Sequence, residues 1–352
     1  MSTGIAVNTF GYSDARWAGA VSAQLTKIQH TSNLYYSEPC ARLAEQLCTR
    51  TGMKKVFFSN SGAEANECAI KVARKYAADK KGADCHVIVS LKNSYHGRTL
   101  TTLAATGQDV FHKDFLPLTS GFVYAEPNNS EDVERLLKEN KCCAIMFEVV
   151  QGEGGVRPLT QEFLTSLEEL AQKYDVLLIA DEVQCGNGRS GELYGYMNYG
   201  INPHIVTTAK GLGGGLPIGA TMLSEKLENT YTPGSHGSTF GGNPVCAAGA
   251  LNIISRLDEM GLGCMLSDLQ RLKRDEMITV DEIRYMFDFL SSLNTLSKKK
   301  KLRDLDGYYP RIMKDILECV DYGYKARAVV NAIAKELMFY SNLTNVDTST
   351  VT

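Results

Sequence analysis

The chain has neither a surplus of charge of one sign nor a long apolar run. Its 352 residues hold 37 lysines and arginines against 40 aspartates and glutamates, which gives a formal net charge of -3. Such a balance provides no strong attraction to nucleic acid or to an anionic membrane surface. No apolar stretch reaches the length of a membrane span, and residues 1–8 lack the basic and apolar blocks of a signal peptide. We therefore expect a cytoplasmic protein without nucleic-acid or membrane partners.

Patterns typical of disulfide scaffolds and metal sites are missing too. The ten cysteines are scattered without CxxC spacing, and several of them, such as Cys142 and Cys143, lie in apolar segments. We interpret them as reduced thiols of the protein core. The six histidines form no HExxH pattern and have no cysteines at zinc-site spacing. We therefore expect no metal site.

What the sequence does contain is an alternation of strand and helix patterns between residues 56 and 261. Short apolar runs predict strands, and apolar residues at helical spacing predict helices. The alternation is typical of an α/β fold with a mostly parallel sheet flanked by helices. The predicted strands are 56–59, 86–91 and 143–150, and the predicted helices are 64–78, 130–139 (capped by Ser130), 160–174 and 243–260.

Two further apolar segments each lead into a charged residue. LLIAD ends at Asp181, and IVTTAK ends at Lys210. Ligands of open α/β sheets bind at the carboxyl ends of the strands, so we expect the acid and the amine at one site. Pyridoxal phosphate requires a carboxylate that keeps its pyridine nitrogen protonated and an amine that forms a Schiff base with its aldehyde. The two segments therefore predict a cofactor enzyme.

A candidate phosphate site lies at residues 57–66, where a predicted strand enters a helix through a turn of small residues. Free amides at a helix start favour a dianionic phosphate. Gly62 and Ala63, which follow Ser61, would let the backbone come close to that phosphate. The same turn is also typical of a serine that only caps a helix, so the sequence leaves both interpretations open.

Six ordered motifs resemble those of the class III pyridoxal-phosphate aminotransferases. They are SNSGAEAN (59–66), SYHGRT (94–99), QGEGG (151–155), DEVQ (181–184), TAKG (208–211) and GSTFGGNP (237–244). The runs TSNLYY (31–36) and LTTLAATG (100–107) are most similar to the acetylornithine-type members. The resemblance extends from about Gly4 to about Gly261. It implies the large domain of the fold type I pyridoxal-phosphate transferases, with pyridoxal 5'-phosphate as cofactor.

The resemblance implies cofactor-binding roles for the matched positions. Lys210 would be the Schiff-base lysine that also moves the substrate proton, and Asp181 would pair with the pyridine nitrogen. Val183 would pack on one face of the ring and Tyr95 on the other. Many relatives have phenylalanine at the position of Tyr95, which leaves its hydroxyl without an implied role. Gln184 would approach the phenolic oxygen. The alternatives are structural: a surface lysine, a salt-bridged aspartate and a core aromatic.

Four more positions concern the substrate and a second subunit. Arg98 matches the position that grips a carboxylate of acetylornithine, a task that suits the paired donors of a guanidinium. Ser238 would be the accompanying hydrogen-bond donor. Glu153 falls where the family keeps a gate that pairs with a second arginine, although it also fits a solvated loop. Thr239 matches the threonine that reaches the phosphate of the neighbouring subunit, which implies a homodimer with shared active sites.

The reaction implied by the resemblance is a transamination of arginine biosynthesis. N-acetylornithine would give its δ-amino group to the cofactor and leave as N-acetylglutamate semialdehyde, and 2-oxoglutarate would then collect the nitrogen as glutamate. The motifs define the reaction more closely than they define the pocket for the substrate side chain. Ornithine, succinylornithine and 4-aminobutyrate therefore stay open as amino donors. A catalytically dead remnant that acts as a binding or structural protein stays open as a different class.

Both ends of the chain depart from the family pattern. Relatives begin a few tens of residues before the match to Gly4, so we expect an N-terminally truncated chain. The C-terminal domain that carries the partner arginine of Glu153 is not found after Gly261, and its loss would impair activity. We expect an N-terminal segment at 1–50, a cofactor-binding large domain at 51–262, and an atypical α-helical region with a disordered tail at 263–352. Helices are predicted there at 282–293, 309–320 and 325–338, with a solvated basic run at 298–301.

Overall fold

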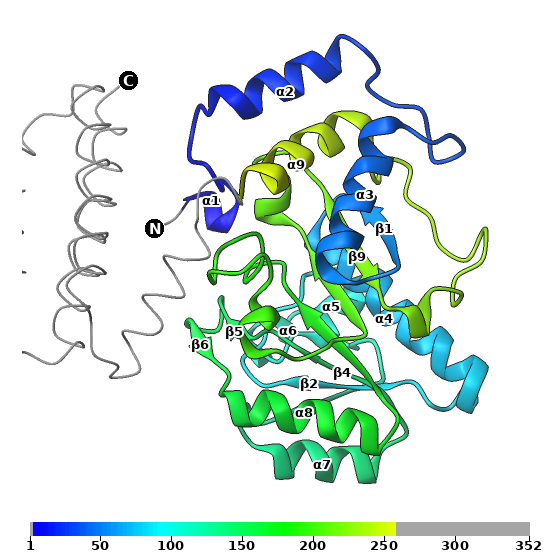
Figure 1. The fold of residues 1–352 in the computed structure, drawn as a ribbon. Coiled ribbons are helices and arrows are strands. Elements are labelled where there is room, and N and C mark those ends of the chain that lie inside the picture. The colour runs from blue at the N-terminus through cyan, green and yellow to red at the C-terminus, as the bar shows by residue number, and fades with distance from the viewer. Residues whose placement is uncertain (1–2, 258–352) are drawn as a thin grey trace, which may run out of the picture. The chain divides into compact units, whose positions relative to one another are not determined.

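One seven-stranded sheet forms the centre of the computed structural model, which describes residues 3–257 (Figure 1). Its strand order is β1-β9-β8-β7-β4-β2-β3. β9 is antiparallel to both of its neighbours, whereas the pairs from β8 to β3 are parallel. The mostly parallel α/β sheet predicted from the sequence is therefore confirmed. The strands are β1 (Lys55–Ser59), β2 (Val87–Leu91), β3 (Phe122–Ala125), β4 (Cys142–Phe147), β7 (Leu177–Asp181), β8 (Ile205–Thr208) and β9 (Gly219–Leu223).

The sheet is buried on both faces, and its central strands β4 and β7 are apolar at nearly every position. All residues of β4, β7 and β8 are buried. Successive side chains of a strand point to opposite faces, so Ile145 and Leu178 belong to one hydrophobic core and Met146 and Ile179 to another. The sheet therefore lies between two cores.

Helices cover both faces of the sheet (Figure 1). α4 (Gly62–Lys81) contributes Ile70 and Val72 to the core that contains Met146. The other core is lined by α3 (Glu38–Thr51), α7 (Ser130–Glu139), α8 (Gln161–Lys173) and α9 (Pro244–Leu257). The remaining elements are α1 (Thr3–Ala6), α2 (Ala15–Leu25), α5 (Leu100–Ala105), α6 (Asp109–His112), the short pair β5 (Val150–Gln151) and β6 (Arg157–Pro158), and the 3-10 turns η1 (Gly195–Tyr199), η2 (Lys210–Leu212) and η3 (Glu225–Leu227).

The N-terminal segment is bound to α9 by a partly buried ion pair. Arg256 Nη1 and Nη2 donate to the two carboxylate oxygens of Asp14 at 2.6 and 3.0 Å. The same guanidinium lies 4.0 Å from the centre of the Phe10 ring. Asp14 also caps α2, because its Oδ1 accepts the Trp17 N–H at 2.7 Å. α2 is consequently packed along α9, with the Trp17 indole against Gly214.

Most of the predicted elements are confirmed, with corrections at their ends. The helices at 64–78, 130–139 and 160–174 are present, but Asn129 rather than Ser130 caps the second, because the Asn129 side chain accepts the Asp132 N–H. The strand predicted at 143–150 ends at Phe147, where the backbone leaves the sheet. β3 and β9 were not predicted.

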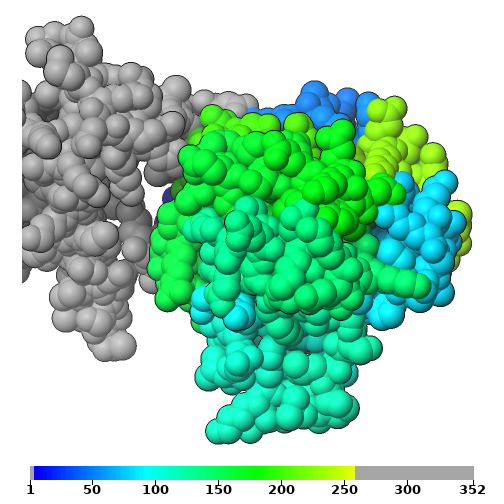
Figure 2. Space-filling view, turned by 90° about the horizontal axis from the view of Figure 1, so that it is seen from below, coloured from blue at the N-terminus to red at the C-terminus, as the bar shows by residue number. Residues whose placement is uncertain are grey.

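Some predictions lie outside the described residues, namely the helices at 282–293, 309–320 and 325–338, the basic run and the tail. Eight of the ten cysteines are described, and all eight are free thiols. Six of them are buried as predicted, whereas Cys40 and Cys48 are only partly buried. Between residues 3 and 257 no helix is long and apolar enough to cross a membrane. In Figure 2, the chain around α6 protrudes from the body as a turquoise lobe, with Val110 and Phe115 exposed on it.

Candidate active site

Six strands of the sheet, β3 beside β2 included, point their carboxyl ends to the same edge. β2, β4, β7 and β8 are mutually parallel, and β1 runs in the same direction because both β1 and β8 are antiparallel to β9. In open α/β sheets this edge is the usual ligand site. The loops that leave it carry the predicted site residues, namely Ser61, Gly62 and Ala63 after β1, Tyr95 and Arg98 after β2, Glu153 after β4, Val183 and Gln184 after β7, and Lys210 after β8.

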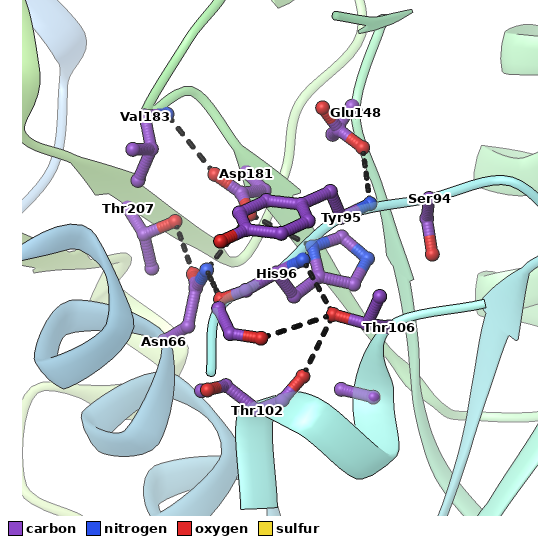
Figure 3. Close-up of polar contacts among 12 residues, drawn as sticks. Asn66, Ser94, Tyr95, His96, Thr102, Thr106, Glu148, Asp181, Val183 and Thr207 are labelled. Carbon is purple, nitrogen blue, oxygen red and sulfur yellow. Dashed lines mark hydrogen bonds and ion pairs between the residues drawn. The ribbon is translucent and has the colours of Figure 1, made fainter. Parts of the chain in front are cut away.

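Asp181 ends β7 and is 3% exposed. Its Oδ2 accepts a hydrogen bond from Asn66 Nδ2 at 2.8 Å and another from His96 Nδ1 at 2.7 Å. Its Oδ1 accepts the backbone N–H of Val183 at 3.0 Å (Figure 3). Both carboxylate oxygens are therefore held in place by three donors.

The two side-chain donors to Asp181 are themselves fixed by neighbours. Asn66 Oδ1 accepts from the Thr207 hydroxyl at 2.7 Å, and Asn66 Nδ2 also donates to the carbonyl of His96 at 2.8 Å. The backbone N–H of His96 donates to Thr106 Oγ1 at 2.9 Å (Figure 3). Buried His96 Nε2 has no hydrogen-bond partner among the described residues. Sequence reasoning did not single out Asn66 or His96, although both lie inside the matched motifs.

Lys210 begins the turn η2, two residues after β8, with a left-handed φ of 46°. Burial lowers the pKa of its amine from the ordinary value, an effect opposed by the charges of Asp181 and Glu148. A lowered pKa increases the share of neutral amine, which is the nucleophilic form. The following residue, Gly211, accepts a hydrogen bond from the Thr9 hydroxyl at 2.9 Å, so the N-terminal segment supports this turn.

Two buried glutamates, Glu148 and Glu182, lie close to Asp181. Glu148 accepts the N–H groups of Tyr95 at 2.9 Å and of Gly152 at 3.3 Å, and burial raises its pKa to about 7. Glu182 accepts the N–H groups of Gly195 and Tyr196 at 2.7 and 2.8 Å, and burial raises its pKa to about 8. Glu148 follows β4 as Asp181 ends β7, and that placement is the signal that sequence reasoning missed.

The turn before α4 supports both interpretations of Ser61. Its hydroxyl caps the helix by accepting the Glu64 N–H at 3.2 Å. Among residues 3–257, no acceptor meets the amides of Gly62 and Ala63, so these remain available to a phosphate. A Cβ on Gly62 would lie only 2.6 Å from Val183 Cγ1. Gly62 is therefore needed for the close contact between the helix start and Val183.

The predicted ring-binding residues converge on the same place. Figure 3 shows Val183, Tyr95 and Asp181 together at the strand ends. The Tyr95 backbone is held by Glu148, as described above. Gln184 lies against Gly152, since a Cβ there would lie 2.1 Å from Gln184 Oε1.

Arg98 and Glu153 occupy the outer part of this edge, and both are exposed. Arg98 Nε donates to the Tyr95 hydroxyl at 3.1 Å, and its guanidinium lies 5.2 Å from the centre of the Phe111 ring. Glu153 Oε2 accepts a hydrogen bond from Gln108 Nε2. The arginine predicted to pair with Glu153 is not among its recorded contacts in the described residues.

Ser238 and Thr239 lie between β9 and α9, and Ser238 contacts the loop after β1. The Ser238 hydroxyl accepts from Asn60 Nδ2 at 3.2 Å and from the Gly241 N–H at 3.1 Å, so its recorded contacts do not include Arg98. Both residues line a groove of about 870 Å³. The segment 30–37 forms another wall of this groove, and two of its residues, Leu34 and Tyr36, are 87% and 102% exposed.

The residues at the strand ends fit pyridoxal phosphate. A carboxyl group held by hydrogen bonds lies at the end of β7, and an amine with a lowered pKa follows the neighbouring strand β8. Free amides open the 20-residue helix α4, which supplies the positive end of a helix dipole. An aliphatic and an aromatic side chain, Val183 and Tyr95, are present to enclose a flat ring.

Comparison with known proteins agrees with these motifs. The sequence profile described as Aminotransferase class-III matches residues 1–284, beyond Gly261, where we expected the family pattern to stop. The acetylornithine aminotransferase of Haemophilus ducreyi is 51% identical over 273 residues, which cover 78% of this chain and 70% of that protein. The succinylornithine transaminase of Salmonella newport is 49% identical over 251 residues, which cover 71% of this chain and 61% of that protein.

A solved structure is similar as well. The ornithine aminotransferase of Toxoplasma gondii, in which PLP partly occupies the active site, is 30% identical with a TM-score of 0.72. The alignment covers 77% of this chain and 64% of that one. The chain thus spans between 61% and 70% of the length of the three relatives described.

Proposed function

Because the chain belongs to the class III aminotransferases, we propose that it binds pyridoxal 5'-phosphate and transfers the δ-amino group of N-acetylornithine to 2-oxoglutarate. The products would be N-acetylglutamate semialdehyde and glutamate, as in cytoplasmic arginine biosynthesis. The observation that carries the proposal is the fixed carboxylate of Asp181 on the strand next to the one that leads to Lys210.

Each residue at the strand ends has a chemical task in this proposal. Bound pyridoxal phosphate supplies an aldehyde that takes up the amino group and a pyridinium ring that withdraws electrons from the carbon that loses a proton. Asp181 pairs with the protonated ring nitrogen, because three hydrogen bonds fix the position of its carboxylate. Lys210 takes the proton from the substrate carbon that carries the amino group and delivers it to the aldehyde carbon of the cofactor, a role that its lowered pKa favours.

Three other groups orient the cofactor. The amides of Gly62 and Ala63 receive the phosphate, with Ser61 beside them as helix cap. Val183 and Tyr95 restrict the ring to one plane, and Gln184 donates to its phenolic oxygen. A fixed plane matters because the bond to be broken has to stand perpendicular to the ring for its electrons to be withdrawn.

Substrate carboxylates are recognised by the outer residues. Arg98 has no carboxylate within ion-pair distance among the described residues, so its guanidinium is open to a ligand. Ser238 would add a hydrogen bond, and Glu153 would act as the gate between the two substrates. In the described residues Glu153 is occupied by Gln108, a neutral partner that an arginine can displace.

We also propose a homodimer in which Thr239 reaches the phosphate of the partner subunit. The exposed apolar residues Leu34 and Tyr36 along the same groove support an interface there. Lys210→Ala and Thr239→Ala variants would each be impaired alone. Mixing them after dissociation should restore activity, because a mixed dimer contains one site with both residues intact. Loss of activity that mixing cannot restore would contradict a shared site.

N-succinylornithine is the second candidate donor, since the similar Salmonella protein carries that name at 49% identity. It differs from N-acetylornithine by a further carboxylate at the far end of the acyl group. Comparison of kcat/KM for the two donors decides between them, and ornithine and 4-aminobutyrate complete the series. A preference for succinylornithine would leave the chemistry in place and change the substrate.

The test of the function is the visible absorbance of the full chain incubated with pyridoxal phosphate. We expect a Lys210-dependent band that bleaches when N-acetylornithine is added and returns with 2-oxoglutarate. Lys210→Ala is the matched control, because it removes the amine and leaves Asp181 in place. Absence of the band in the wild-type chain would favour the alternative of a catalytically dead fold with a binding or structural role.

A further inference from the structure

Arg98, Tyr95 and Phe111 form a cluster at the outer end of the site. The guanidinium carbon of Arg98 lies 5.2 Å from the centre of the Phe111 ring and 5.9 Å from that of Tyr95. The two rings meet edge to face with their centres 5.7 Å apart. The Arg98 side chain is thus placed by two aromatic rings, although it is exposed.

One hydrogen bond then decides which side of the guanidinium is available. Arg98 Nε donates to the Tyr95 hydroxyl at 3.1 Å. A carboxylate pairs with a guanidinium either side-on, through Nε and one terminal nitrogen, or end-on, through the two terminal nitrogens. The hydroxyl occupies Nε and so blocks the side-on mode. Only the end-on pair of donors remains for a ligand.

Tyr95 is itself firmly held on the side of the cofactor site. Its backbone N–H donates to the buried carboxylate of Glu148 at 2.9 Å. The next residue, His96, is bound to Asp181 at 2.7 Å. Figure 3 shows the Tyr95 ring close to Asp181 and Val183. The hydroxyl therefore joins the carboxylate-binding arginine to the residues around the cofactor ring.

We propose that the Tyr95 hydroxyl is a specificity-determining group that presents only the end-on edge of Arg98 to a substrate carboxylate. The inference rests on the proposed function and deepens it. It predicts preference for an amino donor that carries a carboxylate on the carbon far from the reacting amine. It also assigns a role to the hydroxyl oxygen, the one heavy atom by which Tyr95 differs from a phenylalanine.

The experiment compares Tyr95→Phe with the wild-type chain on two donors. N-acetylputrescine is N-acetylornithine without its carboxylate, and so it cannot use Arg98. Loss of one hydrogen bond to an exposed cation should lower the ratio of kcat/KM for N-acetylornithine over N-acetylputrescine by about 5- to 10-fold. The loss should appear in KM more than in kcat, because the hydroxyl acts on substrate placement.

A double mutant tests the route through Arg98. In an Arg98→Gln background no guanidinium is left to orient, so Tyr95→Phe should leave the donor ratio unchanged. Equal losses on both donors in Tyr95→Phe would overturn the inference, since the hydroxyl would then act on the cofactor ring. An unchanged ratio in the wild-type background would overturn it as well.

Binding measurements separate this inference from the proposed function. Calorimetric titration of N-acetylornithine into the cofactor-loaded wild-type chain and Tyr95→Phe reports carboxylate recognition without turnover. If the wild-type chain binds N-acetylornithine but does not transaminate it, the proposed function is wrong. Binding that is about 5- to 10-fold weaker in Tyr95→Phe would still support the role of the hydroxyl. Equal binding by the two proteins, or no binding by either, would overturn the inference.

Discussion

The ion pair between Arg256 and Asp14 allows a sharp prediction about stability. Arg256 is 8% and Asp14 19% exposed at the side chain. Asp14→Ser keeps an oxygen that can cap α2 but removes the charge that faces Arg256. We expect it to lower the free energy of unfolding by about 3 kcal/mol, because a buried guanidinium loses its main partner.

The structure also separates the two tasks of Asp14. Its Oδ1 accepts both the Trp17 N–H and a hydrogen bond from Arg256, so Asp14→Ala loses the cap as well as the charge. The additional loss should be about 1 kcal/mol. Asn252 Oδ1 stays 3.0 Å from Arg256 Nη1 and keeps one hydrogen bond in either variant.

The double variant Asp14→Ser with Arg256→Met is the decisive comparison. It replaces the stranded cation by an apolar side chain beside Phe10, so it should be more stable than Asp14→Ser alone. Urea unfolding followed by fluorescence is suitable, since Trp17 is the only tryptophan of the chain and lies in α2. If the double variant loses as much as the two single variants together, the ion pair does not hold the segment and the reasoning fails.

Three further predictions concern the site. Gly62→Ala should weaken binding of pyridoxal phosphate more than 10-fold in an equilibrium titration, because the added Cβ would lie 2.6 Å from Val183. Gly19→Ala is the control and should not weaken binding, because its Cβ would meet nothing within 4 Å. His96→Ala should also weaken that binding, by about 10-fold, since Asp181 loses a donor; an unchanged affinity would show that Asn66 and Val183 suffice. The pKa of Glu182 is raised to about 8, so the folded chain retains a proton that the unfolded chain has released. Glu182 should therefore lower the free energy of unfolding by about 2 kcal/mol between about pH 6.5 and pH 8, and the urea midpoint of Glu182→Gln should fall less. Glu148, whose pKa is raised to about 7, acts in the same direction at the start of that window. The lowered pKa of His204, about 4, acts in the opposite direction but only below that window.

The sequence was sufficient to predict the elements that are buried on both faces. β7 begins with the apolar run LLIA and β8 with two β-branched apolar residues, and helices such as α8 have their apolar residues at helical spacing with Thr160 as cap. β3 and β9 were not predicted, and the reasons are physical. β3 is a four-residue strand at the edge of the sheet, and β9 begins at Gly219, directly after a glycine-rich loop that contains Pro217.

The candidate site was predictable only in part. Asp181 and Lys210 follow buried strands and have chemistry of their own, so local pattern was enough to select them. Asn66 and His96 matter because α4 and the loop after β2 meet beneath Asp181, and no local pattern reveals that meeting. Glu148 could have been predicted, because it directly follows β4 much as Asp181 ends β7.

The three donors around Asp181 have a thermodynamic consequence. Its carboxylate is ordered by Asn66, His96 and the Val183 N–H before any ligand arrives. The entropy of fixing that side chain is therefore lost when the chain folds and is not lost again on each encounter with a ligand. Affinity at this end of the site depends on how well the core packs as well as on contacts with the ligand, so a distant core mutation that loosens α4 would weaken binding without touching the ligand.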